Sequence, residues 1–139
     1  MSEMARHTLR MSSPPDDVDA VHDLLAVVWT AVPAIGMEDR FSFETALIEL
    51  ASNVMRHADP GSGVSCTLLI ETFPDRIEAT LSDSGEPGDV QLADRDMPDV
   101  LAESGRGIPL IQALVDELRY DRTDGINRWH ITRQLKSDG

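Results

Sequence analysis

The stretch FSFETALIELASNVMRHA, residues 41–58, decides how this chain folds. Its apolar residues recur at spacings of three and four, which places them on one face of an α-helix that points toward a core. The members of this stripe are Ala46, Leu47, Leu50, Ala51, Val54 and Met55. Glu49, Asn53 and His57 stand four residues apart and therefore share another face of the same helix. The sequence Asp59-Pro60-Gly61 predicts the end of the helix.

The pair formed by Glu49 and Asn53 has two interpretations. A carboxylate and a carboxamide one helical turn apart can hold a hydrated cation or orient a hydroxyl group. The same two residues also suit a helix face that only contacts water. Taken alone, the pair favours a face that only contacts water. The motifs further along the chain are needed to distinguish the two interpretations.

The composition is that of a globular protein with one core. The chain has 139 residues, of which 41% are hydrophobic and 27% charged, and we expect a single domain over residues 1–139. No apolar run approaches the roughly 20 residues that a membrane-spanning helix needs, and the N-terminus lacks an apolar signal-peptide segment. We therefore expect a cytoplasmic protein that does not contact a membrane.

The charge and the cysteine content exclude several kinds of site. The sequence has 12 basic and 25 acidic residues, a net charge of −13, which argues against direct binding of nucleic acid. A basic protein surface, or a nucleotide held at a local site, fits this charge better. Cys66 is the only cysteine, which excludes an internal disulfide and a cysteine-rich metal site. We expect Cys66 to be a small buried residue of a strand.

The segments before residue 41 predict a strand and a helix. Residues 5–11 alternate between apolar and polar side chains, which is typical of a short edge strand. A helix is expected over residues 16–31, with Ser13 as its N-cap, His22 as a partly exposed structural residue, and residues 33–39 as the following connector. Its inner stripe would be Val18, Val21, Leu25, Val28 and Val32.

The segments after residue 61 predict four strands. Residues 64–71 and 76–81 each alternate apolar and polar side chains and indicate a β-hairpin. Residues 118–120 and 129–135 predict two closing strands around the turn at residues 123–125.

Glycines mark two further motifs. In Asp83-Ser84-Gly85, a carboxylate at the end of a buried strand could accept a hydrogen bond from an amino group on a planar ring, although an ordinary turn would use the same residues. Gly105-Arg106-Gly107 precedes a predicted helix whose N-terminal N–H groups favour an anion such as phosphate. Residues 91–104 are acidic and predict a mobile cover. The apolar residues of the predicted helix are Ile108, Leu110, Ile111, Leu114, Val115 and Leu118.

The order of these motifs resembles the GHKL ATPase superfamily, which includes histidine-kinase catalytic domains and type II topoisomerases. Glu49-x-x-x-Asn53 resembles the N box of that superfamily, Asp83-x-Gly85 its G1 box and Gly105-x-Gly107 its G2 box. More narrowly, ELASNVMRHA, ESGRGIPLIQALVDEL and DGINRWHIT resemble the bacterial anti-sigma factor serine/threonine kinases. The resemblance extends from the first predicted strand to Leu135.

This resemblance implies a fold and an activity. The fold is a Bergerat-type α/β two-layer sandwich, with a mostly antiparallel sheet of about five strands and three helices on one face. The activity is that of a protein serine/threonine kinase that phosphorylates a serine of an anti-sigma factor antagonist and also sequesters a sigma factor. The implied cofactors are ATP and Mg²⁺, and we expect a homodimer.

The resemblance also gives roles to the residues of the first two motifs. Glu49 would be the catalytic base that takes the proton from the serine hydroxyl. Asn53 would hold Mg²⁺. Asp83 would accept a hydrogen bond from the adenine amino group, and Gly85 would let the nucleotide approach closely. His57 would lie near the phosphates or cap the C-terminus of its helix.

The third motif would bind phosphate, and two features depart from the family pattern. Gly105 and Gly107 would present backbone N–H groups to the phosphates, and Arg106 would add positive charge. The second glycine of the G1 box is displaced to Gly88. Asn127 stands near the place where a threonine often contacts the adenine site in the family.

Two functions of different class therefore stay open. One is the kinase described above. The other is a regulatory module of the same fold that binds a sigma factor or another partner, uses ATP at most as a structural ligand, and phosphorylates nothing. Glu49 favours the kinase, because a pure binding module has no chemical need of a base at that position.

Overall fold

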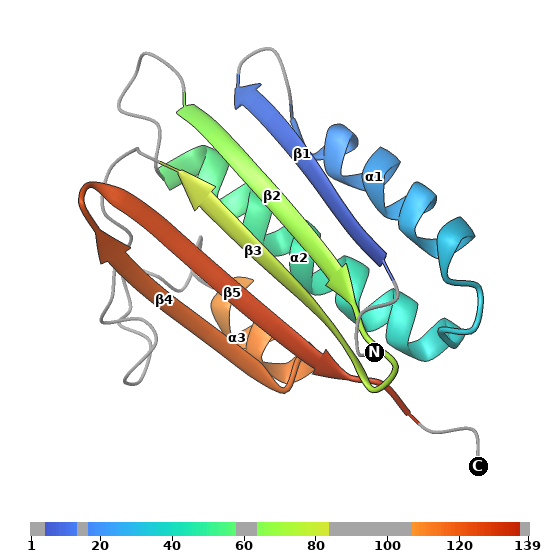
Figure 1. The fold of residues 1–139 in the computed structure, drawn as a ribbon. Coiled ribbons are helices and arrows are strands. Elements are labelled where there is room, and N and C mark those ends of the chain that lie inside the picture. The colour runs from blue at the N-terminus through green and yellow to red at the C-terminus, as the bar shows by residue number, and fades with distance from the viewer. Residues whose placement is uncertain (1–4, 14–16, 58–63, 84–106, 137–139) are drawn as a thin grey trace.

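A single five-stranded sheet covered by helices forms the part of the chain that this computed structural model describes, namely residues 5–13, 17–57, 64–83 and 107–136. Figure 1 shows the helices together on one face of the sheet. The predicted fold class is confirmed. In chain order the elements are β1 (Ala5–Ser13), α1 (Val18–Ala31), α2 (Met37–His57), β2 (Val64–Thr72), β3 (Arg76–Asp83), α3 (Gly107–Leu114), β4 (Glu117–Thr123) and β5 (Ile126–Gln134).

The strand order is β1-β2-β3-β5-β4, and each neighbouring pair is antiparallel. β1 is an edge strand, as its sequence predicts. β4 and β5 form a hairpin whose turn residues Asp124 and Gly125 have φ angles of 55° and 80°. Tight hairpin turns need this left-handed conformation, which Asp tolerates and Gly adopts without cost. Thus the turn signal in the sequence is confirmed, and the flanking strands are longer than predicted.

The two faces of the sheet differ in chemistry because side chains alternate along each strand. On β3, Ile77, Ala79, Leu81 and Asp83 are buried, while the intervening residues are partly exposed. The buried face packs against the helices and forms the core. The largest fully buried side chains include Phe43, Leu47 and Leu50 of α2 and Leu68, Ile70, Leu81 and Ile131 of the sheet.

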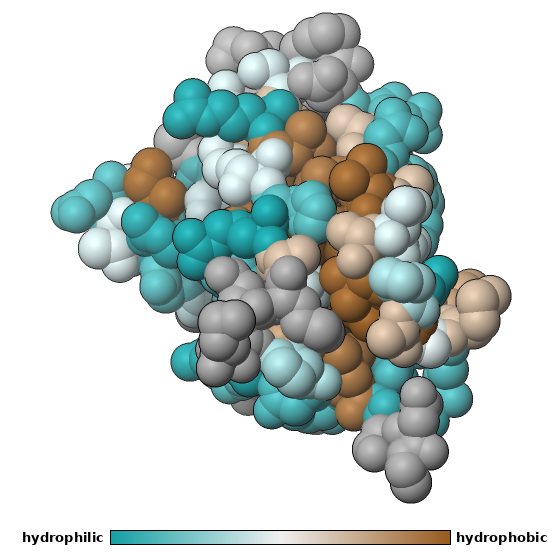
Figure 2. Space-filling model, turned by 45° about the vertical axis from the view of Figure 1, so that its right-hand side comes forward, coloured by the Kyte–Doolittle hydropathy of each residue, from teal (hydrophilic) through white to brown (hydrophobic). Residues whose placement is uncertain are grey.

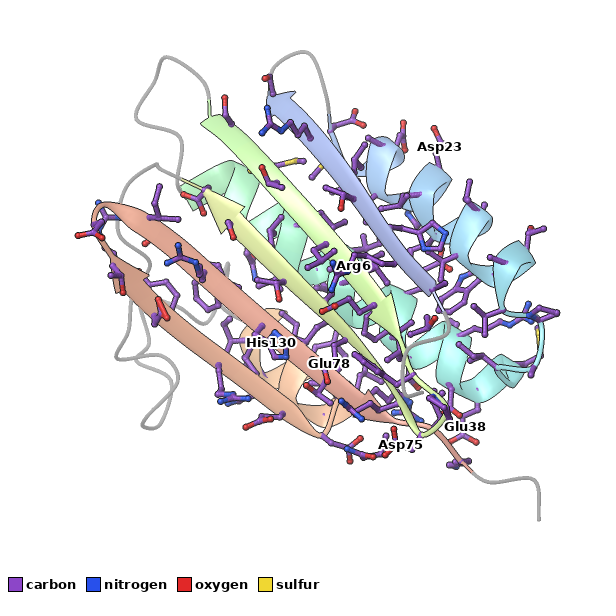
Figure 3. All side chains as sticks on the ribbon, in the orientation of Figure 1. Arg6, Asp23, Glu38, Asp75, Glu78 and His130 are labelled. Carbon is purple, nitrogen blue, oxygen red and sulfur yellow. The ribbon has the colours of Figure 1, made fainter. Side chains whose placement is uncertain are left out.

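The other face of the sheet is polar and carries charged pairs. Figure 3 shows Glu78 and His130 close together on this face, on β3 and β5. His130 Nε2 lies 3.1 Å from Glu78 Oε1, and its Nδ1 lies 2.8 Å from Thr80 Oγ1. Arg6 on β1 donates to Glu71 on β2 at 2.9 Å. These contacts join neighbouring strands through their side chains.

The side of the molecule where β1 meets α1 is hydrophobic. Figure 2 shows a vertical band of apolar surface there, between the polar face of the sheet and the outer side of the helices. Among the helices that the structure describes, none combines the length and the apolar character needed to cross a bilayer. The partly buried apolar residues of β1 and α1 are Ala5, Leu9, Val18, Ala20, Leu24 and Trp29.

α2 begins at Met37 and not at Phe41, so the predicted connector is too long. The backbone N–H of Arg40 donates to Gly36 O at 3.0 Å, and its guanidinium group donates to Ile35 O at 2.7 Å. The first turn of α2, which the sequence did not predict, adds no residue to the buried apolar stripe. Met37 and Phe41 are 79% and 70% exposed. Periodicity therefore gave no signal there, and the signal that remained was the acidic first turn, which favours a helix N-terminus.

The predicted N-cap of α1 is also wrong. Ser13 is the last residue of β1, where it pairs with Val64, and Asp17 caps α1 by accepting from the backbone N–H of Asp19 at 2.8 Å. Strand pairing extends β1 past the point that local sequence suggests. In the C-terminal part, Leu110 is 40% exposed and Leu118 belongs to β4, so the predicted apolar stripe of the third helix is too broad.

α1 and α2 are joined by a carboxylate that accepts from two side chains. Glu44 Oε2 lies 2.9 Å from His22 Nδ1, and Glu44 Oε1 accepts from Trp29 Nε1 at 3.0 Å. The His22 side chain is 47% exposed, in agreement with its prediction as a partly exposed structural residue.

An ion pair ties the start of α2 to the end of the sheet. Asp39 Oδ1 accepts from Arg133 Nε at 2.9 Å, and its Oδ2 accepts from the backbone N–H of Lys136 at 3.0 Å. The side chains of Asp39 and Arg133 are only 4% and 12% exposed. Arg133 also donates to Leu114 O at 2.7 Å, which connects the end of α3 to the same group.

Replacing Asp39 by Asn is expected to lower the free energy of unfolding by about 3 kcal/mol, because it leaves the buried Arg133 without its closest counter-charge. The measurement is urea denaturation followed by circular dichroism. The matched control is Glu38→Gln on the same helical turn, whose side chain is 65% exposed. The control should change stability by less than about 1 kcal/mol. Equal effects of the two substitutions would contradict the assignment.

Candidate functional site

The predicted base and metal ligand lie one turn apart on α2. Asn53 is 8% exposed and stands among the buried residues Leu50, Ala51 and Val54. The side chain of Glu49 is of intermediate exposure. The interpretation of this pair as a face that only contacts water is therefore wrong for Asn53. A buried amide needs hydrogen-bond partners or a ligand, which a solvent-exposed residue does not.

A row of paired residues crosses the buried face of the sheet at one end. We call it the polar row because it contains Asp83, Asn127 and Arg122. The register pairs Met11 with Cys66, Cys66 with Asp83, Asp83 with Asn127, and Asn127 with Arg122. Asp83 and Asn127 are only 3% and 1% exposed. Asp83 is the last residue of β3, as predicted. The next row on the same face contains Leu68, Leu81 and Trp129, which are buried, so the polar row is confined to the sheet end.

Hydrogen bonds connect the polar row into one network. Asn127 Nδ2 donates to Asp83 Oδ1 at 3.0 Å. Asn127 Oδ1 accepts from Tyr120 Oη at 2.5 Å and from Arg122 Nη1 at 2.9 Å. Asn127 stands at a position that the family resemblance places near the adenine site, whereas Tyr120 and Arg122 are not among the predicted site residues. The signal that could have found Arg122 is the Asp124-Gly125 turn, which sets the register that places it opposite Asn127.

The remaining predicted site residues lie at the ends of the described segments or outside them. His57 is the last residue of α2 and Gly107 is the first of α3, so the third motif does open a helix. Gly85, Gly105 and Arg106, together with the predicted cover at residues 91–104, lie outside the described residues. Figure 1 shows that α2 and β3 have their C-terminal ends at the same end of the molecule. The predicted metal ligand, Asn53, and the predicted adenine-binding carboxylate, Asp83, are therefore near the same end of the molecule.

The polar face of the sheet carries a separate hollow of about 450 Å³. None of the predicted site residues that the structure describes lines it, and most of its described lining belongs to the face away from the helices. Its lining residues are Thr80, Arg119, Tyr120, Asp121, Arg128 and His130. In the described ranges, no three or more His, Cys, Asp or Glu residues are grouped so that they could hold a metal ion.

Cys66 is a buried thiol in the polar row, as expected for a strand residue. Its exposed fraction is 4%. Burial, together with the nearby Asp83 carboxylate, raises the pKa of the Cys66 thiol from 9.0 to about 11. Both effects disfavour the thiolate. This environment is the opposite of that of a reactive cysteine.

The fold agrees with the comparison to known families. Residues 11–132 match the family described as "Histidine kinase-like ATPase domain", and the chain belongs to this family. The recognition of the GHKL superfamily from the three sequence motifs is thus confirmed.

The chain is similar to the serine-protein kinase RsbW of Staphylococcus epidermidis. The two are 27% identical over 128 residues, covering 85% of this chain and 80% of the relative. RsbW sequences from the strains ATCC 12228 and ATCC 35984 match to the same extent. These relatives support the narrower resemblance to anti-sigma factor kinases.

A solved structure shares the fold. The crystal structure of the RsbU and RsbW domains of Rv1364c from Mycobacterium tuberculosis superposes with a TM-score of 0.59 at 16% sequence identity. The match covers 94% of this chain and 33% of that chain, so this chain spans a third of its length.

The raised pKa of Cys66 predicts a slow reaction with thiol reagents. At about pH 8 the folded protein should react with an aromatic disulfide reagent at least about 100-fold more slowly than the protein unfolded in urea. Because the folded pKa is raised, the contribution of the neutral thiol to stability is present below pH 9.0 and is lost as the pH rises toward about 11. Equal rates in the two states would contradict this assignment.

Proposed function

We propose that this protein is an ATP-dependent protein serine/threonine kinase of the anti-sigma factor type. Family membership and similarity to a serine-protein kinase support this proposal. The observation that carries it is the burial of two polar residues, Asn53 and Asp83. The resemblance assigns Asn53 to the metal ion and Asp83 to the adenine ring. Burying polar groups costs free energy, and a ligand that binds them is a direct reason to keep them.

The residues present fit ATP with Mg²⁺. The carboxylate oxygens of Asp83 are hydrogen-bond acceptors, which suits an exocyclic amino group. The amide oxygen of Asn53 is a suitable ligand for Mg²⁺, which usually keeps several water molecules and needs few protein ligands. Gly105 and Gly107 would bind the phosphates through backbone N–H groups, with Arg106 and His57 near them. When bound, ATP–Mg²⁺ supplies the phosphoryl group for transfer.

The chemical step assigned to this chain is a proton transfer. Glu49 would take the proton from a serine hydroxyl of the partner protein, while the phosphoryl group passes from ATP to that oxygen and ADP leaves. Asn53, four residues along the same helix, would hold Mg²⁺. The rigid helix keeps the base and the metal ligand at a fixed separation, which is the main requirement of phosphoryl transfer.

The proposal extends to the partners and the setting of the protein. The substrate is a serine of an anti-sigma factor antagonist, and the same chain sequesters a sigma factor. The net charge of −13 favours basic protein surfaces as partners over nucleic acid. We place the activity in the cytoplasm, as part of transcription regulation, and propose that the protein acts as a homodimer.

Calorimetric titration with ATP, with and without Mg²⁺, tests the site. Asp83→Ala should weaken binding with and without the metal, whereas Asn53→Ala should weaken only the Mg²⁺-dependent part, each by about tenfold or more. The matched control is Ser82→Ala, which changes the neighbouring residue on the opposite face of β3. No binding by the wild-type protein at millimolar ATP would overturn the kinase proposal and leave a regulatory module that binds proteins.

A kinase assay with candidate antagonist proteins tests the chemistry. Glu49→Gln should keep ATP binding and lower the rate of serine phosphorylation by about 10²–10⁴-fold, because it removes the base but preserves the shape of the side chain. Glu38→Gln, an exposed carboxylate on the same helix, is the control and should leave the rate unchanged. Full activity of Glu49→Gln would show that Glu49 is not the base.

A further inference from the structure

The side chain of Asn127 makes hydrogen bonds to residues on both neighbouring strands. It is 1% exposed and opposes Asp83 on β3 and Arg122 on β4. We propose that Asn127, oriented by Tyr120 and Arg122, is a specificity-determining residue that holds the Asp83 carboxylate as a hydrogen-bond acceptor. The site then selects a purine with an exocyclic amino group at position 6 over one with an oxo group. This inference rests on the proposed function.

The orientation of the Asn127 amide follows from its partners. Its oxygen accepts from two donors, the Tyr120 hydroxyl and the Arg122 guanidinium group, at 2.5 Å and 2.9 Å. A flipped amide would place N–H groups against the cationic donor Arg122 and would place its oxygen against the Asp83 carboxylate. Both changes are repulsive in a buried site. The NH₂ group therefore faces Asp83, and Nδ2 donates to Oδ1 at 3.0 Å.

The orientation of the Asp83 carboxylate follows from this donor. The amide of Asn127 holds Oδ1 of Asp83 at 3.0 Å, and this bond limits the rotation of the carboxylate. An ionised carboxylate can accept from an amino group but cannot donate to a carbonyl oxygen. Facing the 6-oxo group of a hypoxanthine base, it would meet another acceptor with no proton between them. Sites that hydrogen-bond a substrate group reject analogues that lack it far more strongly than apolar pockets do.

Asn127 acts here as a positioning residue, since it touches Asp83 and not the reacting atoms. The two donors to Asn127 come from β4, and Asp83 comes from β3, so the network spans three adjacent strands. A purely structural role of Asn127 would change stability, and could change affinity for every nucleotide equally. It would not change the ratio of affinities for two nucleotides that differ only at position 6 of the base.

The experiment measures dissociation constants of the Mg²⁺ complexes of ATP and inosine triphosphate by calorimetry, for the full chain and its variants. The wild-type protein should prefer ATP by about 100-fold or more. Asn127→Leu removes the donor and should narrow this preference by about tenfold or more. The preference is a ratio measured at one pH, so titration of the phosphates, which are identical in the two nucleotides, cancels.

A second variant guards against loss of folding. Asn127→Asp has the same shape and keeps an oxygen for Tyr120 and Arg122, but it replaces the donor to Asp83 with a second carboxyl group. Two carboxylates in contact repel each other, so Asp83 is no longer held in its wild-type orientation. This variant should therefore also narrow the preference for ATP. Thr80→Val, on the opposite face of β3, is the matched control and should keep the wild-type ratio.

Each outcome decides between the two proposals. A wild-type protein that binds ATP and inosine triphosphate equally, or folded Asn127 variants that retain the full preference, would overturn the inference but leave the proposed function standing. A loss of affinity for both nucleotides at an unchanged ratio would also overturn it and assign Asn127 a structural role. A wild-type protein that binds neither nucleotide would overturn the proposed function, and the inference with it.

Discussion

The burial of one face of α2 against the sheet is the interaction on which the rest of the structure depends. Phe43, Leu47 and Leu50 are at most 1% exposed and form the centre of the core. An apolar stripe on a helix is narrow, so the residues one step around the helix lie at its border, partly buried and partly accessible. Glu49, of intermediate exposure, lies at that border, and Asn53, which is 8% exposed, lies on its buried side. Packing that stabilises the fold thereby also fixes the positions of the candidate base and metal ligand.

The polar row at the end of the sheet shows how the same core tolerates buried polar groups. Asp83 and Asn127 are almost fully buried, and desolvation of such groups is costly unless hydrogen bonds replace the lost water. The bonds from Tyr120 and Arg122 provide part of this compensation. A satisfied polar network is also stiff, because each member limits the rotamers of its neighbours. A rigid carboxylate at this position suits the proposed site, which would distinguish purine bases by the group at position 6.

Much of the fold could be predicted from local patterns, and the errors have physical causes. The stripe of α2, the alternation of β2 and β3 and the Asp124-Gly125 turn are local signals, and the structure has each of them. The start of α2 was missed because the exposed Met37 and Phe41 do not continue the stripe. The cap of α1 was misplaced because pairing with β2 carries β1 through Ser13. In both cases tertiary contacts, or the absence of them, outweighed the local preference.

The sequence by itself determined the elements, the family and the residues that one helix or one turn brings together. Glu49 and Asn53 are neighbours because a helix repeats every 3.6 residues, and no other part of the chain is needed to place them side by side. The network of Asp83, Asn127, Tyr120 and Arg122 is different. Asp83 and Asn127 are 44 residues apart in sequence. They meet because β5 inserts between β3 and β4. Only the tertiary structure could decide this, because strand order and register are set by the packing of the whole sheet and not by any local pattern.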